Sequence, residues 1–260
     1  MSRIKDWLKR TPFYPLLRAV REALRPKSRI DRIERRDARQ VARILHRVMR
    51  PGGNGVDVGA HQGDVLAEFI RLSPTGQHVA VEPIPEMAVR LQAAFPGATV
   101  HAAAVGDVPG TVEFQWVTSN PAFSGLKRRP DLRPGESIQA IVVRVVCLDD
   151  LIPPGFSVAV LKVDVEGAEL GVLRGASRLL AENRPWVLLE HGSAAATYGT
   201  TTADITAEFA RHRMGVWLMG DWLAGGPPLS ADEFTAAVAG DDVWNFLAGP
   251  LPENVKHVAN

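Results

Sequence analysis

Cysteine is almost absent from this 260-residue chain, because Cys147 is the only one. A single cysteine cannot form an intramolecular disulfide, and it cannot supply the several thiolates of a structural zinc site. The chain also has no apolar run of about 18 residues, which a membrane-spanning helix requires, and no apolar secretory core near its start. We therefore expect a protein of a reducing compartment, the cytoplasm.

Low-complexity sequence is also absent, and 46% hydrophobic with 23% charged residues is typical of a globular protein. The net charge is only +1, but residues 1–50 hold 16 Lys and Arg against 5 Asp and Glu. The remaining residues hold 14 basic and 24 acidic side chains. We therefore expect two parts, a basic arm with an amphipathic helix over residues 1–50 and one main folded domain over residues 51–260.

The arm itself, residues 1–28, mixes Trp, Phe and Tyr with basic side chains, and three prolines interrupt any long helix. Aromatic and basic side chains together suit an anionic surface, so peripheral contact with the inner membrane surface is our preferred hypothesis. A packing extension or a dimer contact explains the arm equally well. Nucleic acid is not an expected partner, because no recognisable motif accompanies the charge.

Apolar spacing over residues 29–50 predicts an amphipathic helix that ends at Pro51. Beyond it, β-rich runs alternate with helical patterns, which indicates βαβ units and a mostly parallel sheet. The predicted strands cover residues 55–58, 77–82, 99–104, 158–163, 186–190, 216–219 and 243–247, and the predicted helices cover residues 64–72, 85–95, 168–182 and 203–213. An insertion adds strands over 111–117 and 138–146, joined by a basic loop over residues 119–137. The fold class is therefore α/β, a Rossmann-like sheet of about seven strands with helices on both faces and an N-terminal helical extension.

The sequence VDVGAHQGD, residues 56–64, lies between a predicted strand and a predicted helix. A nucleotide-binding turn requires this context. Gly59 and Gly63 would let the backbone approach a ligand, and free N–H groups at the helix start can hold a carboxylate or phosphate. The pattern is G-x-x-x-G, because His61 takes the place of a middle glycine.

An acidic residue, Glu82, ends the next predicted strand, 19 residues after Gly63, and Pro83 follows it. A carboxylate at this position accepts hydrogen bonds from both ribose hydroxyls of an adenosine. The two motifs at this spacing predict an adenosine-containing cofactor.

Acidic residues also gather in LKVDVEGAE, residues 161–169, where the fourth strand ends and a helix begins. Ligands of open α/β sheets bind outside such strand ends, so Asp164 is the first functional candidate. Glu169 suits the positive end of the helix dipole, and we assign it that role. Glu190 and His191 close the fifth strand in the same way and should face the same crevice as Asp164. His191 equally suits the role of a packed or surface histidine.

Taken in order, these motifs resemble the FkbM-type methyltransferases. The resemblance covers residues 52–250 and also includes the sequence AVGD at 104–107 and LDDL at 148–151. It implies a class I methyltransferase sheet, S-adenosylmethionine as cofactor and O-methylation in glycan or natural-product pathways. By position it places Asp57, Gly59 and Gly63 around the methionine part of the cofactor, Glu82 at the ribose and Asp107 at the adenine. Ala60, His61 and Pro83 complete the expected cofactor-binding set.

Methyl transfer to a hydroxyl of a sugar, a glycolipid or another natural product requires alignment of the reactants and removal of the hydroxyl proton. We expect Asp164 to remove this proton, and Glu190 and His191 are further candidates for the catalytic base. Mg²⁺ held by Asp164 and Glu190 is an alternative, because carboxylates suit a hard cation. The loop over residues 119–137 carries Ser124, Lys127, Arg128 and Arg129. A loop of this kind would lie over the strand ends, and its charge would suit an anionic group on the acceptor. A solvated surface loop is the alternative, and it explains any single residue of the loop as well.

Two other functions remain open from the sequence. A nicotinamide-dependent oxidoreductase would use Glu82 in the same way, but the missing G-x-G-x-x-G pattern and the KVDVEGAE sequence disfavour it. A catalytically silent binding or scaffold protein would dock through its basic arm. Cofactor turnover separates these alternatives.

Overall fold

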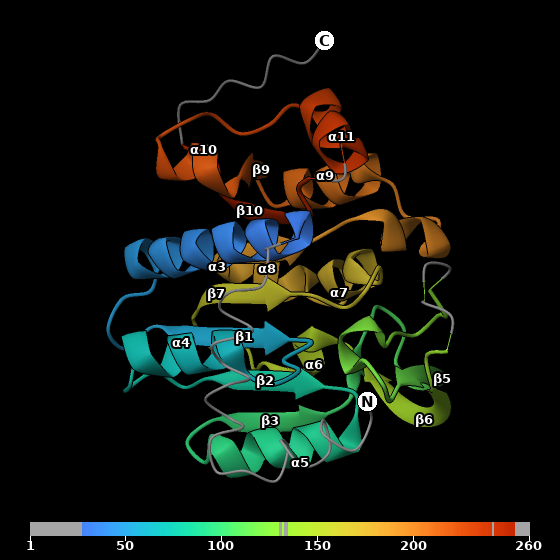
Figure 1. The fold of residues 1–260 in the computed structure, drawn as a ribbon. Helices are drawn as coiled ribbons and strands as arrows, with labels where there is room; N and C mark the ends of the chain where they lie inside the picture. The colour runs from blue at the N-terminus through green and yellow to red at the C-terminus, as the bar shows by residue number, and fades with distance from the viewer. Residues whose placement is uncertain (1–27, 130–131, 133–134, 241, 253–260) are drawn as a thin grey trace, which may run out of the picture. The chain divides into compact units, whose positions relative to one another are not determined.

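The computed structural model describes residues 28–129, 132, 135–240 and 242–252 (Figure 1). The chain divides into two compact units, residues 1–36 and 37–260, so the boundary falls inside helix α3 (Arg29–Val48). The second half of this helix belongs to the larger unit, whereas the sequence interpretation began the folded domain at residue 51. Residues 1–27 lie outside the described residues, and so does the predicted membrane contact of the arm.

A seven-stranded sheet forms the centre of the larger unit, in the order β3-β2-β1-β7-β8-β10-β9. Neighbouring strands are parallel, except that β10 runs antiparallel to both β8 and β9. The strand order reverses between β1 and β7, and ligands of such sheets bind outside the strand ends at this switch point. The strands are β1 (Asn54–Val58), β2 (Val79–Glu82), β3 (Thr99–Ala102), β7 (Val158–Val163), β8 (Trp186–Glu190), β9 (Met214–Leu218) and β10 (Asn245–Pro250).

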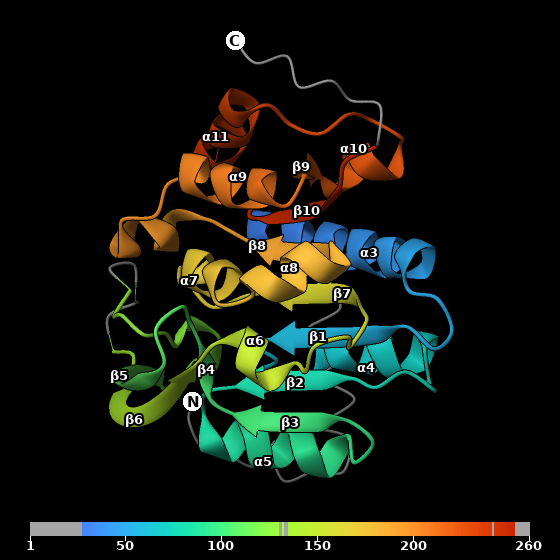
Figure 2. The same cartoon turned by 180° about the vertical axis from the view of Figure 1, so that it is seen from behind.

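Helices cover both faces of the sheet, which confirms the predicted fold class (Figures 1 and 2). One face carries the second half of α3 together with α4 (Asp64–Leu72), α5 (Pro85–Ala94) and α10 (Met219–Leu223). The other face carries α6 (Leu148–Leu151), α7 (Glu169–Arg174), α8 (Ser177–Asn183), α9 (Thr202–Arg211) and α11 (Ala231–Ala239). No helix among the described residues is both long and apolar enough to cross a membrane.

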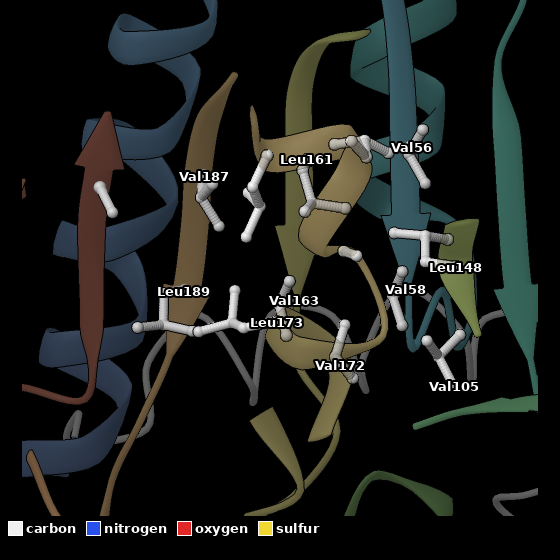
Figure 3. Close-up of a cluster of buried hydrophobic side chains, with 14 of the residues drawn as sticks. Val56, Val58, Val105, Leu148, Leu161, Val163, Val172, Leu173, Val187 and Leu189 are labelled. Carbon is white, nitrogen blue, oxygen red and sulfur yellow. The ribbon is translucent and has the colours of Figure 1, made fainter. Parts of the chain in front are cut away.

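The central strands are almost continuously apolar because both of their faces are covered. Figure 3 shows side chains from three strands meeting Leu148 of α6 and Val172 and Leu173 of α7. Burial of each such side chain contributes about 1.5–3 kcal/mol. The side chains from β1, β7 and β8 that Figure 3 labels are at most 1% exposed: Val56, Val58, Leu161, Val163, Val187 and Leu189.

One predicted helix, over residues 168–182, is in fact two helices, α7 and α8, separated at Gly175. A Cβ at Gly175 would lie 2.2 Å from the carbonyl oxygen of Gly106, so this close approach requires glycine. The carboxylate of Asp149 then accepts hydrogen bonds from the backbone N–H of Arg178 (2.7 Å) and Leu179 (3.0 Å) at the start of α8. Asp149, in the sequence LDDL, is therefore a capping residue.

The predicted insertion forms a second sheet of three strands, in the order β4-β6-β5. The strand predicted over residues 99–104 is split, because Ala104–Val105 (β4) leaves the large sheet and pairs with β6 (Ile138–Val146). β6 also pairs antiparallel with β5 (Gly110–Val117). In both views β5 and β6 lie beyond the arrowheads of β1 and β2 (Figures 1 and 2). The insertion therefore lies beside the carboxyl ends of the strands, where the site was expected.

Candidate functional site

A buried ion-pair group lies at the switch point between β1 and β7. Asp57 and Lys162 are register partners on these strands, and the Lys162 Nζ lies 3.4 Å from Asp57 Oδ1 and 3.0 Å from Asp164 Oδ2. The same ammonium donates a hydrogen bond of 2.6 Å to the carbonyl oxygen of Gly59. Lys162 thus links β1, which ends at the predicted cofactor loop, to Asp164, the first catalytic candidate.

Asp57 is 1% exposed, and neither of its carboxylate oxygens accepts a hydrogen bond within the described part of the chain. Burial raises the pKa of Asp57, and the Lys162 ammonium opposes this shift. Burial alone would lower the pKa of Lys162, but Asp164 and Asp57 outweigh it and hold that pKa above its ordinary value. The two groups therefore stabilise each other's charged forms.

The predicted cofactor loop contains three left-handed residues, Gly59 (φ 76°), His61 (φ 48°) and Gly63 (φ 86°). A Cβ on Gly59 would lie 1.8 Å from the carbonyl oxygen of Asp164, and one on Gly63 would lie 2.6 Å from the Phe95 ring. Both glycines are thus required by packing within the protein, in addition to any approach of a ligand. The His61 Nε2 is buried and has no hydrogen-bond partner in the described part of the chain.

Glu82 lies at the end of β2, directly beside this loop, and is 4% exposed. Its carboxylate accepts backbone hydrogen bonds from His61 (2.9 Å, Oε2) and Ile84 (3.0 Å, Oε1). Burial raises the pKa of Glu82, and these two bonds oppose the shift. Each oxygen keeps a further lone pair, so the geometry agrees with a carboxylate that receives two ribose hydroxyls.

Three carboxylates meet where β7 and β8 end. One oxygen each of Asp164, Glu166 and Glu190 lies within 4.8 Å of the others. The predicted neighbours Asp164 and Glu190 are thus brought together, and Glu166 joins them. Burial raises the pKa of Glu166 to about 8, and burial with the charges of Asp164 and Glu166 raises the pKa of Glu190 well above its ordinary value. Such crowding of like charges favours uptake of a proton or a cation.

His191, the third catalytic candidate, lies outside this cluster. It is 2% exposed, its Nδ1 lies 3.4 Å from Glu169 Oε2, and its ring centroid lies 5.7 Å from that of Phe234. Glu169 is 1% exposed and accepts a 2.6 Å hydrogen bond from the backbone N–H of Gly167. This is the geometry of a packed histidine, the alternative that the sequence left open.

Asp107, the predicted adenine contact, is exposed in the turn after β4. Its carbonyl oxygen accepts from the Sγ of Cys147 at 3.5 Å, and its side chain lies near Gly171 of α7. Its role toward the adenine therefore stays a prediction.

The basic loop reaches the carboxylate cluster, as expected from the sequence. Arg129 forms an ion pair with Glu166, and its guanidinium lies 4.7 Å from the ring centroid of Phe123. The backbone N–H of Lys127 donates to the Tyr198 hydroxyl at 2.9 Å. Ser124 is buried, and its Oγ accepts from the N–H of Val117 at 3.0 Å. Ser124 therefore holds the loop to β5.

The family of this chain follows from its similarity to known proteins. Residues 57–215, more than half of the chain, match the family model described as the Methyltransferase FkbM domain. The chain belongs to the FkbM methyltransferase family. This membership confirms the resemblance seen in the motifs. A search of the curated proteins finds no match.

Several solved structures are similar to this FkbM-family chain. The FkbM methyltransferase of Methylobacillus flagellatus matches 80% of this chain and 50% of its own, with 20% identity and a TM-score of 0.48. A SAM-dependent O-methyltransferase of Thermotoga maritima matches 88% of this chain and 74% of its own, with 13% identity and a TM-score of 0.41. Aeropyrum pernix fibrillarin, with bound S-adenosylmethionine, matches 81% of this chain and 74% of its own, with 12% identity and a TM-score of 0.43. The chain thus spans about half the length of the Methylobacillus protein.

Sequence reasoning missed three residues of the FkbM-family site. Lys162 was visible inside KVDVEGAE, and its position opposite Asp57 follows from the strand register. Glu166 was not a candidate from the sequence, because its left-handed φ of 56° could not be read there. Tyr198 lies in the 3-10 helix η2 (Ser193–Tyr198), and no sequence signal connected it to Lys127.

Proposed function

We propose that this chain transfers the methyl group of S-adenosylmethionine to a hydroxyl oxygen of a sugar, a glycolipid or another natural-product acceptor. One observation carries the proposal. Charged groups line the carboxyl edge of the sheet: Glu82 and Asp57 are buried, the half-buried Lys162 pairs with Asp57 and Asp164, and Asp164 lies beside Glu190. One end of this row suits a ribose, and the other end suits a hydroxyl that must lose a proton.

The residues fit the cofactor at two points. Neither oxygen of the buried Asp57 carboxylate accepts a hydrogen bond within the described residues, although the Lys162 ammonium lies 3.4 Å from Oδ1, and this supports a place for Asp57 beside the ammonium group of the methionine part. Glu82 has lone pairs left for two ribose hydroxyls. The cofactor, when bound, supplies a methyl group on a sulfonium, and an acidic site favours this positive charge.

The acceptor hydroxyl must lose its proton as its oxygen forms the new bond to the methyl carbon and the bond from carbon to sulfur breaks. Asp164 already has the Lys162 ammonium at 3.0 Å. No cation in the described part of the chain forms an ion pair with Glu190, and burial together with the charge of Asp164 raises its pKa well above the ordinary value. In its ionised form the carboxylate with the raised pKa is the more basic of the two, so we propose Glu190 as the base and Asp164, the first candidate from the sequence, as the group that orients the hydroxyl.

A divalent cation is an alternative way to acidify the hydroxyl. Asp164, Glu166 and Glu190 offer only oxygen ligands, which suits Mg²⁺, but Glu166 is already paired with Arg129. We therefore assign the cation, where one binds, to Asp164 and Glu190, as the sequence predicted. Turnover that survives EDTA without loss would exclude this form of the mechanism.

The first test is calorimetric titration with S-adenosylhomocysteine and, separately, with NADH. We expect the unaltered chain to bind S-adenosylhomocysteine alone, Glu82→Ala to lose this binding and Glu86→Ala to keep it. Glu86 is a suitable control because it is exposed in the first turn of α5, four residues from Glu82. A circular dichroism melt of each variant verifies folding.

The other outcomes decide between the alternatives. Binding of NADH would replace methyl transfer with the oxidoreductase function. Binding of neither ligand to the folded protein would favour the silent scaffold. Binding of S-adenosylhomocysteine by all three proteins would remove Glu82 from the cofactor site.

A further inference from the structure

Two consecutive residues after β7, Glu166 (φ 56°) and Gly167 (φ 104°), adopt left-handed conformations. Glycine does so without strain, but a glutamate is rarely found there. Such a conformation persists only where the surrounding structure fixes it. The contacts that fix this turn therefore decide where the Glu166 carboxylate points.

A buried pair fixes the turn from one side. Glu169 Oε1 accepts the backbone N–H of Gly167 at 2.6 Å, and Glu169 Oε2 lies 3.4 Å from His191 Nδ1. Both side chains are 2% exposed. His191 is itself fixed to the neighbouring chain segment, because its backbone N–H donates to the carbonyl oxygen of Trp244 at 2.7 Å.

The 3-10 helix η2 closes the turn from another side. A Cβ on Gly167 would lie 2.6 Å from the carbonyl oxygen of Ala194 and 2.8 Å from the Tyr198 ring. The turn therefore has little freedom to rotate, provided that Glu169 keeps its hydrogen bond to Gly167.

The turn presents Glu166 to the basic loop. Arg129 pairs with the Glu166 carboxylate, and a Cβ on Gly125 would lie 3.6 Å from the Glu166 Cβ and 3.4 Å from the Tyr198 hydroxyl. At its base the loop is joined to β5 by two hydrogen bonds between Gln115 and Gly125. Farther out, residues 125–129 have two attachments: Lys127 binds η2 through the Tyr198 hydroxyl and the Thr197 carbonyl oxygen, and Arg129 binds Glu166.

We propose that Glu169 and His191 are positioning residues that hold the Glu166–Gly167 turn, and that Glu166 in this turn docks residues 125–129 at the edge of the site. His191 therefore acts through Glu169 and Glu166 and does not touch the reacting atoms. That the docked residues contact the acceptor rests on the proposed function. The docking itself does not, so it is tested without cofactor or acceptor.

Limited proteolysis reads the docking directly, because Lys127 and Arg128 are trypsin sites within the docked residues. The full chain is digested briefly, and mass spectrometry measures cleavage after Lys127 and Arg128. Cleavage after Arg90, exposed in α5, reports global unfolding. The variants are His191→Phe, which keeps an aromatic ring against Phe234 but removes the donor, and His191→Asn, which keeps a donor near the position of Nδ1.

We expect His191→Phe to accelerate cleavage after Lys127 and Arg128 about tenfold, as the loss of one buried hydrogen bond implies, with little change at Arg90. His191→Asn should restore the slow rate. Glu166→Gln, at a side chain that is 14% exposed, should accelerate cleavage at the same two sites. This variant tests the proposal where His191→Phe does not fold. An unchanged rate in folded His191→Phe or in Glu166→Gln, or equal acceleration at Arg90, would overturn the proposal.

Discussion

Replacing Lys162 with methionine removes the one ammonium that joins Asp57, Asp164 and the Gly59 carbonyl. The side chain is 13% exposed, and its partner Asp57 is 1% exposed and accepts no hydrogen bond from any described residue. Breaking a buried pair by removing one partner costs about 3–5 kcal/mol, because the other charge stays buried. For a domain of this size that is a fall in Tm of about 6–20 °C.

Urea unfolding, followed by tryptophan fluorescence and circular dichroism, measures the free energy of unfolding of each variant. Lys127→Met makes the same change at an exposed side chain and should cost less than about 1 kcal/mol. The double variant Asp57→Asn/Lys162→Met should recover part of the loss, because it removes the uncompensated charge. A loss below about 1 kcal/mol for Lys162→Met would refute the reasoning, and so would a double variant that is less stable than the single one.

Two further predictions concern the fold. His78 is 3% exposed, its Nδ1 accepts from Gly55 N–H at 3.1 Å and its Nε2 donates to the Ser73 carbonyl at 2.8 Å, so it is neutral in the folded protein. Burial lowers the pKa of His78 from 6.5, so the contribution of the neutral ring to stability is complete above pH 6.5 and is lost as the pH falls below it. Urea unfolding at about pH 7.5 and at about pH 5 should therefore show a smaller decline in the free energy of unfolding for His78→Gln than for the unaltered chain. Ile44, in the second half of α3, is 0% exposed, and Ile44→Ala should lower the free energy of unfolding by about 2–5 kcal/mol, whereas Ile30→Ala, at a side chain 53% exposed, should cost less than about 0.5 kcal/mol. Equal effects of the two alanine variants in urea unfolding would contradict the assignment of the second half of α3 to the folded unit.

The alternation of apolar strands with amphipathic helices was enough to predict the large sheet. Strand β7 agrees with its predicted bounds because both ends of its apolar run are marked by polar or turn residues, Ser157 and Asp164. The motifs also predicted that Asp164, Glu190 and His191 would face one crevice, because the carboxyl ends of parallel strands meet at one edge; the structure brings Asp164 and Glu190 together and places His191 beside Glu169. These properties depend on local pattern, which the sequence carries directly.

The break between α7 and α8 was not predictable in this way. The residues around Gly175 continue a helical pattern, whereas the Gly106 carbonyl that excludes a side chain at this position comes from another part of the chain. The split between β3 and β4 has a similar origin, because β4 pairs with β6, more than 30 residues later in the sequence.

The sequence by itself determined the fold class, the family and the edge of the sheet where we propose the site, since these follow from periodicity and from motifs at strand ends. Only the tertiary structure decided which charges meet: Lys162 against Asp57, Arg129 against Glu166 and His191 against Glu169. Each pair joins residues 22 to 105 positions apart. Whether such groups touch depends on strand register and on a left-handed turn, and packing from several elements at once fixes both.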